Sequence, residues 1–170
     1  VFDQTRMGAL RFKLSEDGPF LDNQADMSTP PWTRIRELEA AVSEIESDRD
    51  VVSPWVINLL APGSSLGGAR PKANVLDQDG SLWIAKFPSQ NDKFDVGAWE
   101  YVTYELARQC GIVMAKSKAQ AFLGKNHTFL TRRFDRINGK GRLHFASAMT
   151  LLRHNDGDDF RSGGSYLELV

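Results

Sequence analysis

The chain has 170 residues, of which 41% are hydrophobic and 25% charged, as is ordinary for a globular protein. The formal net charge of −1 gives no basic surface for direct nucleic-acid binding, and no apolar run approaches the ~18 residues of a membrane span. The single cysteine, Cys110, cannot form an internal disulfide, which favours a reducing cytoplasm. We therefore expect one cytoplasmic domain, or one domain with part of a neighbour. Cys110 lies in a helical pattern, where we expect a small core residue rather than a nucleophile.

The first fifty residues predict one strand and one helix. The residues whose alternation predicts a strand with one buried face are Leu10, Phe12 and Leu14. A polar linker at 22–31 follows, and Ser28 or Thr29 could cap the helix predicted over 32–47. The apolar positions of that helix, which form one stripe, are Ile35, Leu38, Val42 and Ile45. We expect this stripe to face the protein's own core, with binding of a partner protein as the alternative.

Residues 51–88 contain a short apolar segment and then a hairpin. The pattern over 51–62 predicts a short buried helix with Ser53 as its cap. A loop of small residues starts at Gly63, and the two apolar runs that follow it are separated by a turn at 77–80. Glycine, serine and alanine let backbone N–H groups approach an anion, and Lys86 at the end of the second run could lie near the same anion. The alternative is an ordinary surface hairpin. No Gly-Lys pair occurs in the loop, which disfavours a Walker nucleotide site.

The segment from residue 95 to 134 predicts one helix and two strands. Asp95 suits the N-cap of the helix and Gly111 its C-terminal end. The apolar positions of this helix are Val96, Trp99, Val102, Leu106, Ala107 and Cys110. Residues 112–122, with Lys116 and Lys118 pointing outward, and residues 128–134 predict strands. The charges at 132–136 are also compatible with an edge strand.

The C-terminal part is more polar. It predicts a turn at 138–141, a return strand at 142–145, a helix at 146–152 capped by Ser147, and the first turns of another helix at 165–170. His127 and His144 are isolated, and His154 lies in a polar loop beside Asp156 and Asp158. No cluster of metal ligands follows from this spacing, so we expect no metal site.

Four motifs occur in order: GGARPKA at 67–73, DGSLWIAKFPS at 79–89, E-x-x-x-x-E-L-A-R-x-x-G-I from Glu100, and RRFDR at 132–136. Together they resemble the HipA-type toxin serine/threonine kinase family over about residues 63–152. The resemblance implies an α+β fold: a kinase-like small lobe in which a helix packs on a twisted antiparallel sheet. It divides the chain into the end of a β-rich N-terminal subdomain with a connecting helix (1–50), the nucleotide-binding lobe (51–152) and the start of a large lobe (153–170).

The resemblance also implies a site for ATP. Lys86 would hold phosphates, Glu100 would orient Lys86, and the small-residue loop would cover the nucleotide. The nucleotide-binding residues that it implies are Ser64, Ser65, Leu66, Gly67, Gly68, Ala69, Lys72, Lys86, Glu100, Arg132 and Phe134. Ser65 resembles a serine that the family autophosphorylates, and Phe134 resembles the aromatic residue of the hinge. Arg132 stands where a glutamate is often found, so an adenine contact by its side chain is in doubt. Without the resemblance, Glu100 would be taken for a surface glutamate.

Phosphoryl transfer needs an aspartate that aligns the acceptor and another that holds Mg²⁺, and no matching motif occurs here. We therefore expect the nucleotide-binding portion of a larger kinase, with its catalytic residues and Mg²⁺ ligands downstream, and no activity for this fragment alone. The expected partners are a protein substrate and a helix-turn-helix antitoxin repressor. The alternative function is a non-catalytic module that docks such a repressor through residues 32–47 or 153–162.

Overall fold

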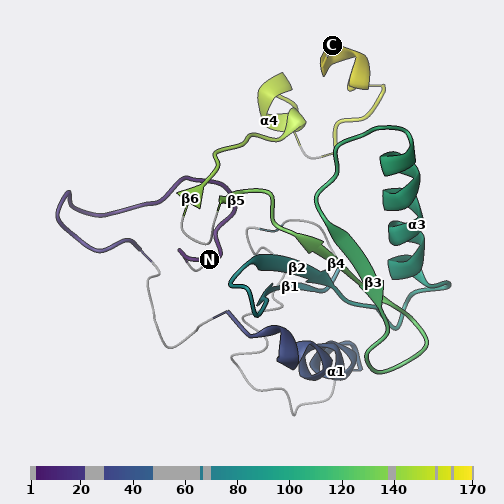
Figure 1. Cartoon of the computed structure of the whole chain (residues 1–170). Helices are drawn as coiled ribbons and strands as arrows, with labels where there is room; N and C mark the ends of the chain where they lie inside the picture. Colours follow the sequence, from purple (N-terminus) through teal and green to yellow (C-terminus); the bar gives the residue numbers. More distant parts are fainter. Residues whose placement is uncertain are drawn as a thin grey trace.

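A four-stranded antiparallel sheet forms the centre of the chain (Figure 1). In the computed structural model, the described residues are 3–21, 29–47, 66, 70–137, 141–155, 157–161 and 163–169. The strands are β1 (Lys72–Leu76), β2 (Leu82–Lys86), β3 (Ser117–Gln120) and β4 (Thr128–Arg132), in the spatial order β1-β2-β4-β3. Each pair of neighbours is antiparallel. The sheet and its helices confirm the predicted α+β fold.

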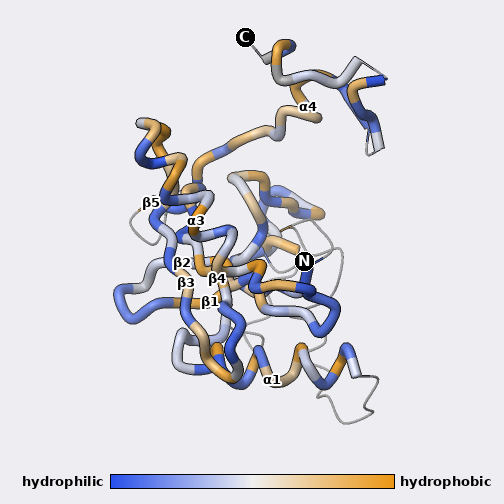
Figure 2. The backbone as a smooth tube through the Cα atoms, turned by 90° about the vertical axis from the view of Figure 1, so that its right-hand side faces the viewer, coloured by the Kyte–Doolittle hydropathy of each residue, from blue (hydrophilic) through white to orange (hydrophobic). Residues whose placement is uncertain are grey.

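Helix α1 (Ile35–Glu46) covers one face of the sheet and follows a 3-10 turn, η1 (Trp32–Arg34). The buried residues that pack together here are Ile35, Leu38, Val42, Ala73, Val75, Trp83, Ala85, Phe87 and Leu130. The predicted stripe thus faces the protein's own core, apart from Ile45, which is 40% exposed. Figure 2 shows the resulting alternation of hydrophobic and hydrophilic segments along α1. The predicted side-chain cap at Thr29 is wrong, because Pro31 precedes the helical turn and no side chain caps it.

The hairpin of β1 and β2 confirms the predicted turn. Asp77 and Ser81 close it through a backbone hydrogen bond of 2.9 Å, and Gly80 has a φ of +78°, a conformation that favours glycine. Odd-numbered residues such as Ala73 and Ala85 point toward α1. Because side chains alternate along a strand, Lys72 and Lys86 lie on the opposite face.

Helix α3 (Val96–Gln109) lies on that opposite face, next to β3 and β4. It has the predicted bounds, since the Asp95 side chain accepts a hydrogen bond from the Ala98 amide and Gly111 follows with a φ of +81°. Its predicted apolar stripe is exposed, however, with Trp99 at 60% and Leu106 at 56%. Cys110 is exposed as well, so its assignment to the core is wrong.

Shorter elements complete the described part of the chain. Strands β5 (Arg136–Ile137) and β6 (Gly141–Arg142) form a separate pair beside the N-terminal segment. Helix α4 (Ala148–Leu152), capped by Ser147 as predicted, and the 3-10 turn η2 (Tyr166–Leu169) lie apart from the sheet (Figures 1 and 2). The predicted helix at 51–62 lies outside the described residues. None of the described helices is long and apolar enough to cross a bilayer.

Two local predictions fail. Leu10, Phe12 and Leu14 are 59%, 51% and 89% exposed and belong to no strand, because no neighbouring strand in the described chain covers them. Lys118 does not point freely outward: its Nζ atom lies 3.8 Å from the centroid of the Trp32 ring. The side chain therefore shields the edge of the core on the α1 side, as a long amphipathic side chain can.

Candidate functional site

Lys86 and Glu100 form an ion pair between the sheet and α3. Lys86 is the last residue of β2, and Glu100 lies in the second turn of α3. The Nζ atom of Lys86 donates to Oε1 of Glu100, and the two side chains are 31% and 30% exposed. The same ammonium lies 5.4 Å from the centroid of the Phe129 ring. The pair is therefore half-buried against an aromatic surface yet open to a ligand.

Lys72 adds a second positive charge to this face of the sheet. It pairs with Lys86 in the register of β1 and β2, and only 8% of its surface is exposed. Burial, followed by the charges of Lys86 and Arg70, lowers the pKa of the Lys72 ammonium. An anion bound between the two lysines would offset this repulsion, so the hairpin end favours a phosphate group over a cation.

The position of α3 depends on its first turn. The Asp95 carboxylate accepts hydrogen bonds from the amides of Ala98 and His127, at 3.0 and 2.9 Å, and lies 2.5 Å from the His127 ring. Gly97 packs so closely that an added Cβ would lie 1.9 Å from the carbonyl oxygen of His127. Burial alone would raise the pKa of Asp95, but these hydrogen bonds lower it. This junction fixes α3, and with it Glu100, against the start of β4.

Arg70 anchors the end of the small-residue loop. Its guanidinium binds both oxygens of Asp92, at 2.6 and 2.8 Å, and donates to the carbonyl of Phe87 at 2.9 Å. Asp92 also accepts from the amide of Ser89. This bidentate pair joins the loop end to the segment after β2. Leu66 lies in a turn and is half-buried, while Ser64, Ser65, Gly67, Gly68 and Ala69 lie outside the described residues.

The side chain of Arg132 does not lie on the face of the sheet that carries Lys72 and Lys86, which we call the lysine face. Arg132 pairs with Trp83 in the register of β4 and β2, so strand alternation directs its side chain to the α1 side. Its amide donates to the carbonyl of Lys116 at 2.8 Å. Phe134 is 56% exposed and packs edge-on against Phe145, with ring centroids 5.1 Å apart. The structure therefore brings together Lys72, Lys86 and Glu100, and it does not add the Arg132 side chain to them.

Sequence reasoning missed the ionic groups that follow β4. Because β4 lies between β2 and β3, Arg132 at its end does not belong to an edge strand. Arg133 and Asp135 are 3% and 0% exposed. A run of alternating charges is usually solvated, and only their burial distinguishes these two residues.

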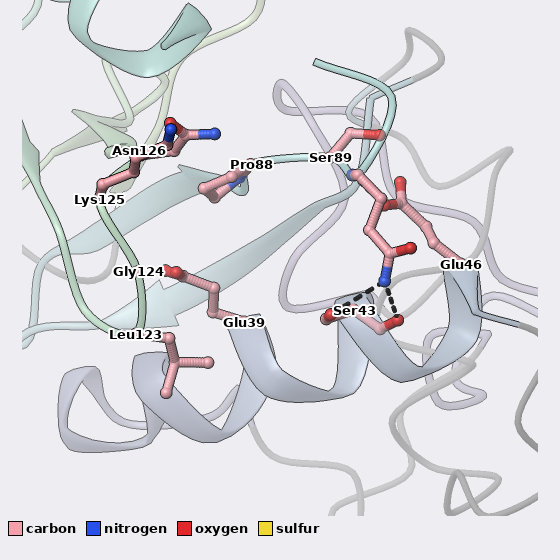
Figure 3. A pocket seen from close by; sticks show the side chains of 10 residues that line it. Glu39, Ser43, Glu46, Pro88, Ser89, Leu123, Gly124, Lys125 and Asn126 are labelled. Atoms are coloured by element: carbon pink, nitrogen blue, oxygen red, sulfur yellow. Dashed lines mark hydrogen bonds between the residues drawn. The ribbon is translucent and has the colours of Figure 1, made fainter. Parts of the chain in front are cut away.

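A pocket of about 340 Å³ opens on the α1 side of the sheet (Figure 3). Glu39, Ser43 and Glu46 of α1 line one wall, and the segments around Gln90 and Lys125 line the other. Gln90 bridges the two sides by donating to Ser43, and Glu39 accepts from the buried hydroxyl of Thr128 at 2.6 Å. Several polar groups of the pocket are thus engaged within the protein, and Lys72 and Lys86 do not line it.

The histidines form no metal centre in the part of the chain that the structure describes, where no group of three or more ligands is arranged to hold an ion. His127 binds Asp95. His154 contacts Glu168 at 3.0 Å and Asp158 at 3.3 Å, and Glu168 is the main cause that raises the pKa of His154. These contacts account for both side chains as local hydrogen-bonding groups.

A family model described as the HipA-like C-terminal domain matches residues 64–170. Comparisons with curated proteins and with solved structures gave no match. The matched region begins in the small-residue loop and includes the hairpin, the lysine face and α3.

Proposed function

The chain belongs to the family of HipA-like C-terminal domains, and we propose that it carries the ATP-binding portion of a serine/threonine protein kinase. The observation that carries the proposal is the pair of Lys86 in β2 and Glu100 in α3. In protein kinases a strand lysine binds the phosphates of ATP, and a helix glutamate orients that lysine. The two residues here come from the same kinds of element and make the same contact.

The lysine face fits the phosphates of a nucleotide. Lys72 and Lys86 supply two charges at the hairpin end, and Arg70 fixes the end of the loop that we expect to cover the nucleotide. Glu100 is engaged by Lys86 and is poorly suited to hold Mg²⁺ as well. Mg²⁺, which neutralises developing charge during phosphoryl transfer, would therefore be held by groups other than Glu100.

The adenine is expected near the segment that follows β4. The amides of Arg132 and Arg133 already donate within the sheet, to Lys116 and Leu82. Phe134 is the first exposed residue beyond them, and its ring offers an apolar surface. We therefore place the adenine contact at Phe134 and at backbone groups rather than at the Arg132 side chain.

The parent protein would be a cytoplasmic kinase of a toxin–antitoxin system, with a protein substrate and a helix-turn-helix repressor as partner. Ser65 would be its regulatory phosphorylation site. A phosphoserine adds roughly −1.5 to −2 charges, which would repel the nucleotide's phosphates. The phosphate could be held by basic groups nearby, but Arg70 must first leave Asp92. Mass spectrometry of the complete protein after incubation with ATP and Mg²⁺ tests this, and phosphate mapped only elsewhere rules Ser65 out.

The alternative function, a non-catalytic module that docks a repressor, loses one of its two surfaces. The apolar stripe of α1 is buried in the protein's own core. The other surface, 153–162, remains exposed at Phe160, which is 78% accessible. A pair of catalytic aspartates in the downstream coding sequence would decide for the kinase.

ATP titration of the complete protein tests the proposal, with Lys86→Ala as the variant and Lys125→Ala as the matched control. Lys125 is an exposed lysine on the pocket side of the sheet. Loss of a charge-assisted hydrogen bond costs about 1.5–3 kcal/mol, so the Kd for ATP should rise about tenfold or more in Lys86→Ala only. Phosphorylation should be lost with it. Equal ATP affinity in both variants would refute the assignment of Lys86.

A further inference from the structure

Two regions more than a hundred residues apart in the sequence meet in a buried ionic cluster. Arg133 and Asp135 have side chains that are 0% exposed and form a bidentate pair, at 2.6 and 2.9 Å. Arg136 also donates to Asp135, at 2.6 Å. Burial alone would raise the pKa of Asp135, but Arg133, the amide of Gly8 and Arg136 lower it. The carboxylate is therefore held as an anion between two guanidinium groups.

The remaining hydrogen bonds of this cluster go to the N-terminal backbone. Arg133 donates to the carbonyl oxygens of Thr5 and Arg6, at 2.6 and 3.0 Å. The amide of Gly8 donates to Asp135 at 2.7 Å. Gly8 has a φ of +72°, which a residue with a side chain rarely adopts. Residues 4–8 thus complete the hydrogen bonding of a buried ion pair.

Arg136 and Arg142 extend the contact with the N-terminal backbone. Arg136 donates to the carbonyl oxygens of Gln4 and Arg6, at 3.0 and 2.7 Å, and Arg142 donates to the carbonyl of Asp3 at 2.7 Å. Three guanidinium groups from one region therefore bind successive carbonyls of the other. These contacts therefore depend on the position of the backbone carbonyls of the N-terminal segment and not on its side chains.

The cluster is also joined to the strands that carry the lysines. Arg133 donates to Oδ1 of Asn74 at 2.7 Å, and Asn74 lies on the same face of β1 as Lys72. The amide of Arg133 donates to the carbonyl of Leu82 at the start of β2. One buried residue thus connects the N-terminal segment, the β1–β2 hairpin and the segment after β4.

We infer that Asn74, Arg133 and Asp135 are positioning residues for the nucleotide site, and that the backbone of residues 4–8 is part of its support. The inference rests on the proposed function, because it assigns these groups to ATP affinity. The lysine pair depends on the register of β1 with β2, and Arg133 holds both strands. Loss of the N-terminal carbonyls would leave two buried N–H groups of Arg133 without acceptors, which is unfavourable enough to make the segment after β4 rearrange.

The experiment measures two quantities on the complete protein: hydrogen exchange at the Gly8 amide, and the KM and kcat for ATP. Asp135→Asn should speed Gly8 exchange and raise the KM, since the acceptor charge is lost. Asn74→Ala removes the link to β1 without touching the buried pair, which protects the test if Asp135→Asn fails to fold. It should raise the KM several-fold while leaving kcat and Gly8 exchange nearly unchanged. Arg34→Gln, which removes an exposed arginine paired with Glu37, is the matched control.

A fall in kcat with an unchanged KM in Asn74→Ala would indicate loss of folded protein and overturn the positioning role. Unchanged Gly8 exchange in a folded Asp135→Asn would overturn the support by residues 4–8. The proposed function fails separately, if the unsubstituted protein binds no ATP. ATP binding that Asn74→Ala leaves intact would instead overturn this inference and leave the proposed function standing.

Discussion

Lys72 and Lys86 lie directly opposite each other across the β1–β2 hairpin, although both are cationic residues. Like charges in this position destabilise a sheet, and Lys72 is also 92% buried by its neighbours, with 8% of its surface exposed. Both ammonium groups thus lie on one face of the hairpin end, where the proposed site would present them to the same anionic ligand.

Lys72→Met is expected to weaken ATP binding and to change how the free energy of unfolding depends on pH. The pKa of Lys72 is lowered in the folded state, so the unfolded chain binds more protons and the wild type gains stability as pH rises toward the ordinary lysine pKa. That gain should be smaller in Lys72→Met. Urea unfolding in neutral and alkaline buffers measures the pH dependence, and ATP titration measures the affinity. Identical pH profiles for the two proteins would show that burial of the Lys72 ammonium has no cost in stability.

Glu100→Gln should preserve the fold but lower kcat/KM for ATP in the complete protein by about 10–100-fold, because a neutral amide orients the Lys86 ammonium less well. Glu105→Gln is the matched control on the same helix, since Glu105 pairs with the exposed Arg108 of its own helix. Steady-state kinetics of the two variants, with circular dichroism as a check on folding, make the comparison. Equal kinetics would remove Glu100 from the site.

Gly97→Ala should destabilise the protein by about 1–3 kcal/mol or more, the range typical of overpacking. Alanine normally favours a helix over glycine by about 1 kcal/mol, but here its Cβ would lie 1.9 Å from a backbone oxygen of His127. Gly124→Ala, where nothing lies within 4 Å of the added Cβ, is the control. Chemical denaturation measures both. A Gly97→Ala protein as stable as the wild type would contradict the close approach of α3 to β4.

Asp95→Asn should reduce the loss of protein stability that occurs as the pH falls into the acidic range. The pKa of Asp95 is lowered in the folded state, so its carboxylate stabilises the protein above the unfolded pKa, and this contribution is lost as pH falls through the folded one. The wild type should therefore lose more stability than Asp95→Asn between about pH 5 and pH 2. Thermal melts across that range give the comparison, and parallel curves would exclude the predicted role of the carboxylate.

The parts of the fold that sequence predicted are those fixed by neighbouring residues. Asp95 and Gly111 bound α3 because capping is local, and the turn at Gly80 placed Lys86 at the end of a strand. The buried pair of Arg133 and Asp135 could not be predicted in the same way. Its partners include backbone carbonyls more than a hundred residues away. Every residue has a backbone carbonyl, so the sequence does not indicate which ones accept these hydrogen bonds.

The prediction for α3 shows a second limit. Helical spacing identified the apolar residues of α3 correctly, but periodicity does not say what covers them, and Trp99 is exposed in the described structure. In α1 the same kind of stripe is buried against the sheet. The two helices differ in their neighbours rather than in their patterns.

The strand order β1-β2-β4-β3 has a consequence for how the chain folds. Each half of the sheet is a hairpin between neighbouring strands, and such hairpins form in about 1–10 μs. The seam between them pairs Lys86 with Phe129 across a long stretch of chain that includes α3, so it closes later, at a larger cost in chain entropy. Lys86 belongs to this seam and Glu100 to the connection across it. A nucleotide bound at this pair, as we propose, would therefore stabilise the docked hairpins and neither hairpin alone.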